Sequence, residues 1–116
     1  MEIDRETLAW VAGIMDGEGC FYASKARRIQ IAVNQRVDED GRCRMIERLA
    51  AAIPFGKSYG PREHRQPEGV GKKRWRPYMR FQVSGFQNVQ AVVSLLWPWL
   101  GEVKRQQAEG ALRRCH

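Results

Sequence analysis

The chain has few of the features that would place it in a membrane or outside the cell. Its 116 residues contain no apolar run of the ~18 residues needed to cross a bilayer. Residues 1–5 lack the charged and then apolar pattern of a secretion signal. We therefore expect an intracellular protein of the cytoplasm, the nucleoid or an organelle matrix, which is not secreted and has no membrane partner.

Cysteine is also scarce, and its spacing is irregular. Cys20, Cys43 and Cys115 lie far apart and form no Cys-x-x-Cys pair. An odd and dispersed set of cysteines argues against a disulfide framework and against a zinc site. The sequence predicts three reduced thiols.

Negative charge is in short supply. Thirteen acidic residues stand against 20 basic ones, which gives a net charge of +7. The excess is concentrated in residues 57–80, where eight Lys and Arg residues accompany two Glu and the aromatic residues Tyr59, Trp75 and Tyr78. On charge alone this segment could be a nuclear-localisation patch or a solvated loop. The aromatic residues favour a nucleic-acid partner.

The hydrophobic pattern predicts one domain over residues 1–116, with a mixed α+β fold. Apolar spacing of three and four residues indicates helices, and strict alternation indicates strands. The resulting order is αββαββα with an additional C-terminal helix, and a four-stranded antiparallel sheet would carry the helices on one face. We expect helices over residues 4–17, 42–53, 86–97 and 102–114, and strands over residues 20–26, 28–37, 57–62 and 74–84.

The opposite face of this sheet would be polar, basic and rich in planar groups. Guanidinium and amide groups of this kind can read base edges in a DNA major groove. An ordinary solvated sheet face is the alternative. The residues assigned to this DNA-binding face are Tyr22, Ser24, Arg28, Gln30, Asn34, Lys57, Tyr59, Arg76, Tyr78, Arg80 and Gln82.

The end of the first helix is the most informative segment. Asp16 and Glu18 alternate with Gly17 and Gly19. The C-terminal end of a helix already carries partial negative charge, so each carboxylate there destabilises the helix by roughly 0.3–1 kcal/mol. A hard cation such as Mg²⁺ would reverse that cost, because it prefers carboxylate and carbonyl oxygens. One carboxylate and one carbonyl are too few ligands, so a second copy or a DNA phosphate must complete the shell. Solvation, or pairing with arginines, is the alternative.

Residues 8–21, Leu-Ala-Trp-Val-Ala-Gly-Ile-Met-Asp-Gly-Glu-Gly-Cys-Phe, resemble the signature of the LAGLIDADG homing endonucleases. The match covers residues 11–19, with Val11 in place of the first Leu and Glu18 in place of the final Asp. The predicted element order resembles one domain of that family and extends the likeness over most of the chain. Near the C-terminus, Trp-Pro-Trp-Leu at 97–100 followed by Lys104 resembles a second family feature, an apolar stretch that leads to an active-site lysine.

The resemblance implies a site-specific double-stranded DNA endonuclease. Such single-motif proteins work as homodimers on pseudo-palindromic sites, hydrolyse phosphodiester bonds with Mg²⁺ or Mn²⁺, and take no small-molecule substrate. Ca²⁺ is expected to bind without supporting cleavage. The two sheets would form a saddle on the DNA.

The resemblance also implies roles for individual residues. Glu18 and the carbonyl of Gly17 would bind the metal. Gln35 would position the water network, at a rim that Arg42 or Arg44 could share. Lys104 would steady the attacking water or the phosphate. At the dimer interface, the residues implied are Ala12 and Gly13, which would pack the two motif helices together, and Asp16, which would tie down the helix end.

Glutamate at position 18 keeps a second interpretation open. Its additional methylene could misplace the metal and leave a protein that binds without cutting. That protein would be a DNA-binding regulator or an RNA-binding intron maturase of the same fold. A basic scaffold with no nucleic-acid site is a third interpretation.

Overall fold

The computed structural model describes residues 3–63 and 76–115 and confirms the expected order of elements. The first two residues of the strand expected over 74–84 lie outside the described residues, and within them that strand begins at Tyr78. None of the helices in the described ranges is long and apolar enough to cross a membrane. The elements are α1 (Arg5–Glu18), β1 (Gly19–Ala23), β2 (Ile29–Arg36), α2 (Arg44–Ala52), β3 (Gly56–Arg62), β4 (Tyr78–Ser84), α3 (Phe86–Leu96), the short 3₁₀ helix η1 (Trp97–Trp99) and α4 (Glu102–Cys115).

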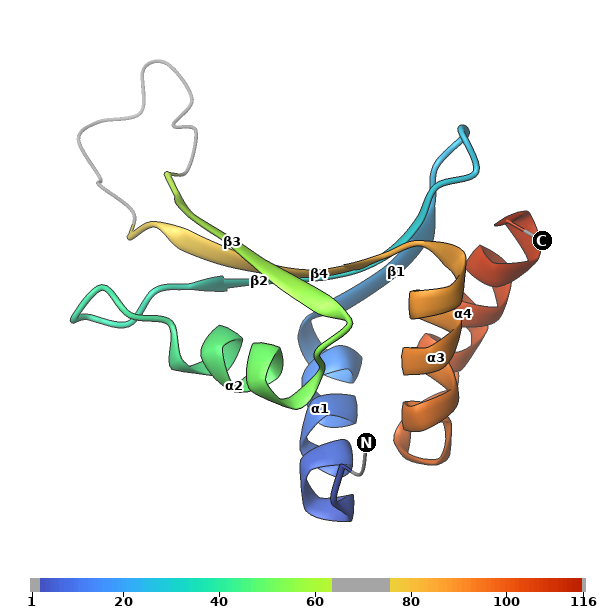
Figure 1. Cartoon of the computed structure of the whole chain (residues 1–116), viewed down its shortest axis with the longest axis horizontal. Helices are drawn as coiled ribbons and strands as arrows, with labels where there is room; N and C mark the ends of the chain where they lie inside the picture. Colours follow the sequence, from blue (N-terminus) through green and yellow to red (C-terminus); the bar gives the residue numbers. More distant parts are fainter. Residues whose placement is uncertain (1–2, 64–75, 116) are drawn as a thin grey trace.

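The four strands form one antiparallel sheet in the order β1-β2-β4-β3. Figure 1 shows the sheet as a curved layer with the helices below one side of it and the other side open. The α+β class, the antiparallel sheet and the one-sided helical layer are therefore confirmed.

The core lies between the sheet and the helices, and strand alternation decides which side chains enter it. Ile31 pairs with Val83 and Val33 pairs with Phe81, and all four side chains are fully buried. Since paired residues of antiparallel strands point to the same face, the residues between them point to the open side. The predicted alternation in β2 and β4 is thus confirmed.

One expectation about α1 is wrong. Ala12 was assigned to the contact between two motif helices, but it is fully buried within its own chain. It follows Val11 and lies one turn after Leu8, and both of these residues are buried. The apolar stripe that faces the core therefore includes Ala12, and this side chain is not available to a partner.

The junction between α1 and β1 has no connecting residue. Asp4 caps the start of α1, because its carboxylate accepts a hydrogen bond of 2.8 Å from the N–H of Thr7. Gly17 does not stop the helix, which continues to Glu18, and Gly19 already belongs to β1. A Cβ at Gly19 would lie 2.7 Å from the Met15 carbonyl oxygen, so this tight turn requires glycine.

Two glycines provide a matched test of packing. Gly56 pairs with Val83 at the start of β3, and a Cβ there would overlap the ring of Phe81. We expect Gly56→Ala to lower the free energy of unfolding by about 1–3 kcal/mol, because an overfilled core must shift. Gly110→Ala in α4, where a Cβ meets nothing within 4 Å, should raise the free energy of unfolding by about 0.5–1 kcal/mol. Urea unfolding at one protein concentration measures both, and equal effects would contradict the register of β3.

Candidate metal-binding and nucleic-acid-binding site

The end of α1 presents an exposed carboxylate beside an amine from α4. Glu18 and Gly17 are exposed, and the last carbonyls of a helix lack partners within the helix. The Lys104 Nζ donates to the carbonyl oxygen of Gly19 at 2.6 Å and to the Gln107 Oε1 at 3.3 Å. Lys104 therefore reaches the residue next to Glu18 across 85 positions of sequence. The sequence placed both residues in one site, and their catalytic roles stay predictions.

The Asp16 side chain binds the backbone at the start of α4. Its two carboxylate oxygens accept the N–H of Gly101 at 2.9 and 3.1 Å, directly before the first residue of α4. A carboxylate at a helix N-terminus is favourable, because the helix carries partial positive charge there. The Asp16 carboxylate thus fixes the start of the helix that carries Lys104. Its expected place in a dimer interface stays a prediction.

Gln35 lies near the same corner but on the side of β2 that faces the helices. It is two residues beyond Val33, the partner of Gly19, it pairs with Met79, and it is half-buried. Beside it, the end of the sheet is hollowed by about 420 Å³. The residues that line this hollow are Asn34, Gln35, Arg36, Arg62, Glu63, Tyr78 and Arg80.

Arg36 and Arg62 were not among the expected DNA-binding residues. Both are exposed, and they are the pairing partners of Tyr78 on the two strands that flank β4. The alternation of β2 already placed Arg36 on the open side. The position of Arg62 depends on the irregularity between Tyr59 and Arg62, which no pattern in the sequence indicates.

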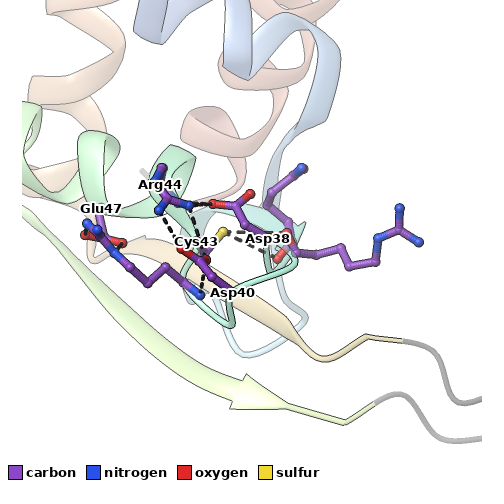
Figure 2. Close-up of polar contacts among 8 residues, drawn as sticks. Asp38, Asp40, Cys43, Arg44 and Glu47 are labelled. Atoms are coloured by element: carbon purple, nitrogen blue, oxygen red, sulfur yellow. Dashed lines mark hydrogen bonds and ion pairs between the residues drawn. The ribbon is translucent and has the colours of Figure 1, made fainter.

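The turn from β2 into α2 is built from charged pairs that involve the two arginines proposed for the active-site rim. Arg44 bonds to Asp38 at 3.0 Å and to Asp40 at 2.5 Å, as Figure 2 shows. Arg42 bonds to Glu47 at 2.7 Å. These pairs are more than one-third exposed, so solvent screens them and each contributes little stability. Their effect is to fix the turn, and both arginines are engaged with acids of the same turn.

The same ion pairs lower the pKa values of Asp40 and Glu47. The hydrogen bond from Arg44, followed by the N–H of Arg42, lowers the pKa of Asp40 to about 2. The bond from Arg42 lowers the pKa of Glu47. Cys43, whose Sγ lies 3.8 Å from the carbonyl oxygens of Gln35 and Arg36, has its pKa raised by burial.

Arg80 is the centre of a hydrogen-bonded group on the open face of the sheet. Its guanidinium donates to the Gln82 Oε1 at 2.9 Å, to the Tyr22 hydroxyl at 3.2 Å and to the Asn34 Oδ1 at 3.5 Å. The Gln82 amide in turn donates to the Ser84 hydroxyl at 2.8 Å. Residues from β1, β2 and β4 thus hold one planar cation in a defined orientation. The structure brings together four of the residues that the sequence assigned to DNA binding.

The other assigned residues lie around this group. Lys57 and Tyr59 are the β3 partners of Gln82 and Arg80, and both are exposed. Gln30 pairs with Tyr22. Ser24 and Arg28 belong to the turn after β1, where the Ser24 hydroxyl accepts the Arg28 N–H at 3.2 Å. Arg76, half-buried, and Tyr78 lie just before and at the start of β4.

The exposed side of α1 is lined by small residues. Ala9, Gly13 and Gly17 recur every four residues and are exposed, and a Cβ at Gly13 or Gly17 would meet nothing within 4 Å. This side can approach another helix closely. Of the small residues of α1, Ala12 is buried, whereas Ala9, Gly13 and Gly17 remain exposed, and their contact with a second α1 stays a prediction.

Within residues 3–63 and 76–115, no three His, Cys, Asp or Glu residues gather in a way that could hold a metal ion. Glu18 with the neighbouring carbonyls supplies hard oxygen donors of the type that Mg²⁺ takes. This part of one chain therefore offers the right kind of ligand but too few ligands.

The Arg44 pair gives a pH-dependent prediction. Asp40 should titrate near pH 2 in the wild type, and in Arg44→Met its pKa should rise toward 3.8, because the largest cause of the lowering is removed. Because folding lowers the pKa of Asp40, the ionised carboxylate stabilises the folded state at pH values above the unfolded pKa. This stabilisation is lost as pH falls toward 2. Carboxyl ¹³C shifts followed against pH measure this change. Asp4, whose pKa is lowered by Thr7, is the control, and an Asp40 pKa that does not move would contradict the assignment.

Of the comparisons with known proteins, only the one with solved structures found matches. No family model matches the chain, and no curated protein matches its sequence. Among solved structures, the homing endonuclease I-CvuI in complex with DNA is 21% identical with a TM-score of 0.67, over 94% of this chain and 65% of that one. The homing endonuclease I-TnaI is 17% identical with a TM-score of 0.62, over 97% and 71%.

The LAGLIDADG meganuclease I-AabMI, bound to uncleaved DNA, is 20% identical with a TM-score of 0.59, over 84% of this chain and 31% of that one. This chain thus spans just under two thirds of I-CvuI and less of I-AabMI. At these identities the likeness establishes architecture. The chain has the fold of the LAGLIDADG homing endonucleases.

Proposed function

We propose that this chain is one subunit of a homodimeric, metal-dependent endonuclease that cuts double-stranded DNA at a specific, pseudo-palindromic site. The observation that carries the proposal is the corner where the exposed Glu18 ends α1 and the Lys104 Nζ lies 2.6 Å from the carbonyl oxygen of Gly19. An acid that could hold a metal ion thus directly precedes the residue whose carbonyl binds a cation that could contact a phosphate, and β1 of the sheet begins at this point.

A divalent ion would supply this chemistry. The neighbour I-CvuI has been crystallised on DNA in the presence of 2 mM Mg, where the DNA was not cleaved, and in the presence of 2 mM Ca. The Glu18 carboxylate and the carbonyl of Gly17 would hold the ion in this chain, with DNA phosphate oxygens and the second subunit completing the shell. When bound, such an ion lowers the pKa of water and neutralises charge on the scissile phosphate. Mg²⁺ or Mn²⁺ would serve in cleavage, and Ca²⁺ in binding alone.

The side chains around the ion would orient the reactants. Lys104 is held by Gly19 and Gln107, so its ammonium faces the phosphate with little freedom to move. A fixed cation of this kind stabilises the charge that develops on the phosphate oxygens during hydrolysis. Gln35, at the same end of β2, offers an amide that can donate to and accept from water.

The incomplete metal site and the exposed side of α1 support the proposed homodimer. Residues 1–116 contain one copy of the motif, and cutting both strands in this way needs a second copy. Ala9, Gly13 and Gly17 leave room for a second α1 at close range. Two copies related by a two-fold axis would place two Glu18 residues at the centre and continue the two sheets into one saddle.

The open sheet face would read the DNA. Arg80 keeps donors for a base edge while Tyr22, Asn34 and Gln82 fix its orientation. A bidentate arginine–guanine contact in the major groove contributes about 1–3 kcal/mol of discrimination.

A second candidate function is a protein of the same fold that binds DNA or intron RNA without cutting. The longer side chain of Glu18, compared with aspartate, favours it. Both candidates require the basic sheet, and they differ only in what happens to the bound nucleic acid.

Glu18→Gln separates the two functions. A randomised duplex pool is first selected for retention by the wild-type protein in Ca²⁺, and the retained duplexes are then incubated with Mg²⁺ or Mn²⁺. The wild type should cut them. Mutation of a residue that only orients a metal ligand lowers metal affinity or activity by roughly 10–100-fold. Loss of a ligand itself should cost more, so Glu18→Gln should cut at least about 100-fold more slowly while it still binds the pool.

Glu39→Gln, which changes an exposed acid of the turn after β2, is the control and should cut at the wild-type rate. Equal rates for Glu18→Gln and the wild type would refute the metal-ligand assignment. A wild-type protein that retains DNA but leaves it intact with every divalent ion would establish the non-cutting function.

Gly13→Leu tests the dimer. The leucine should force two α1 helices apart and convert the dimer into a monomer, as measured by sedimentation velocity. Gly110→Leu makes the same change at another open position of a helix and should leave the dimer intact. A wild-type chain that sediments as a monomer both alone and with DNA would contradict the proposal.

A further inference from the structure

Two basic segments from opposite ends of the sequence meet at the outer end of β1. The turn after β1 carries Lys25, Arg27 and Arg28, and the last turn of α4 carries Arg113 and Arg114. All five side chains are exposed. We call this group the hairpin–helix patch. Of its members, only Arg28 belongs to the DNA-binding face described above.

Contacts between the two segments hold the patch together. The Cys115 Sγ donates to the carbonyl oxygen of Arg27 at 3.2 Å, across 88 positions of sequence. Arg114 lines a hollow with Tyr22 and Ala23 of β1. Figure 1 shows the C-terminal end of α4 beside the turn between β1 and β2, and α4 packs against β1.

The turn itself has a defined shape that presents its cations outward. The Ser24 carbonyl accepts the Arg27 N–H at 2.9 Å, and the Ser24 N–H donates to the Arg28 carbonyl at 2.8 Å. Arg27 has a φ of 58°, which is the left-handed conformation that closes a three-residue hairpin loop. A glycine or asparagine usually occupies such a position, whereas here it is an arginine.

Little negative charge offsets the patch. No acidic residue occurs between Gly19 and Val37, and Glu109 is the only one after Glu102. Glu109 lies 3.9 Å from Arg113, whose side chain is 82% exposed, so this pair is weak. Cations at the end of α4 also favour the helix dipole, but that effect does not account for three further cations on the turn.

We propose that the hairpin–helix patch binds the backbone phosphates of duplex DNA beyond the segment that the sheet covers. This inference rests on the proposed function and adds a second contact region to it. The cations of the patch differ from Arg80, which three neighbouring side chains orient. Exposed cations on a turn and a helix end suit the phosphate backbone, which fixes position and carries no sequence information.

The hairpin–helix patch and the Glu18–Lys104 corner lie at opposite ends of β1. β1 runs from Gly19, beside the Glu18–Lys104 corner, to Ala23, beside the patch. Its five residues span about 17 Å, or about five phosphates along one DNA strand at 3.4 Å each. Loss of the patch should therefore weaken binding without slowing the cutting of DNA that is already bound.

The experiment is the salt dependence of binding to a fluorescently labelled mixed-sequence duplex longer than the sheet, followed by anisotropy in Ca²⁺. Arg114→Gln and Lys25→Gln should each reduce the slope of log K against log salt by about 0.9 for every phosphate that the protein no longer neutralises. Arg5→Gln, which removes the same charge at the exposed start of α1, is the matched control and should leave the slope unchanged. On a short duplex that covers only the sheet, all three should bind like the wild type.

Three results would overturn the inference. If Arg114→Gln and Lys25→Gln keep the wild-type slope while Arg80→Gln weakens binding, the sheet binds DNA and the patch does not. If the variants lose more affinity for a hairpin RNA than for the duplex, the patch serves RNA. If the wild type does not bind duplex DNA under any salt condition, the proposed function fails together with this inference.

Discussion

The candidate active corner depends on the pair of hydrogen bonds between the Asp16 carboxylate and the N–H of Gly101. These bonds join the end of the first helix to the start of the last one. Lys104 follows three residues later and reaches the carbonyl of Gly19, so the amine is brought to the residue that follows Glu18 although 85 positions of sequence separate Lys104 from Gly19. Of the two acids of the motif, Asp16 is engaged in holding the chain together, and the exposed Glu18 remains available for a cation.

The cations of this protein fall into groups with different surroundings. Arg42 and Arg44 are paired with acids of their own turn, Arg80 is oriented by neutral polar groups, and the patch at the end of β1 is exposed. A guanidinium fixed by amides and a hydroxyl keeps its positive charge unneutralised and its plane defined. This arrangement suits recognition of a base, whereas a cation neutralised by carboxylates mainly stabilises the local fold.

Much of the fold could be predicted from the sequence, because local rules decide it. The Asp4 cap, the alternation of β2 and β4 and the order of the elements depend on neighbours within a few residues. The position of Ala12 was misjudged because alanine is compatible with both a core and an interface, and only the packing of α1 against the sheet decides between them. Gly17 did not end the helix, because the tight turn into β1 requires glycine at position 19 instead. The bonds from Asp16 to Gly101 and from Cys115 to Arg27 join distant segments, and no periodicity in the sequence indicates them.

The direct passage from α1 into β1 at Gly19 has a mechanical consequence. No residue separates the helix that ends in Glu18 from the strand that carries Tyr22, so few backbone angles lie between the two. In a dimer on DNA, the distance between the bases under the sheet and the bond beside Glu18 would then be set by covalent geometry. Under the proposed function, redesign of the open sheet face would alter which DNA sequence is chosen and would leave the position of the cut within that sequence unchanged.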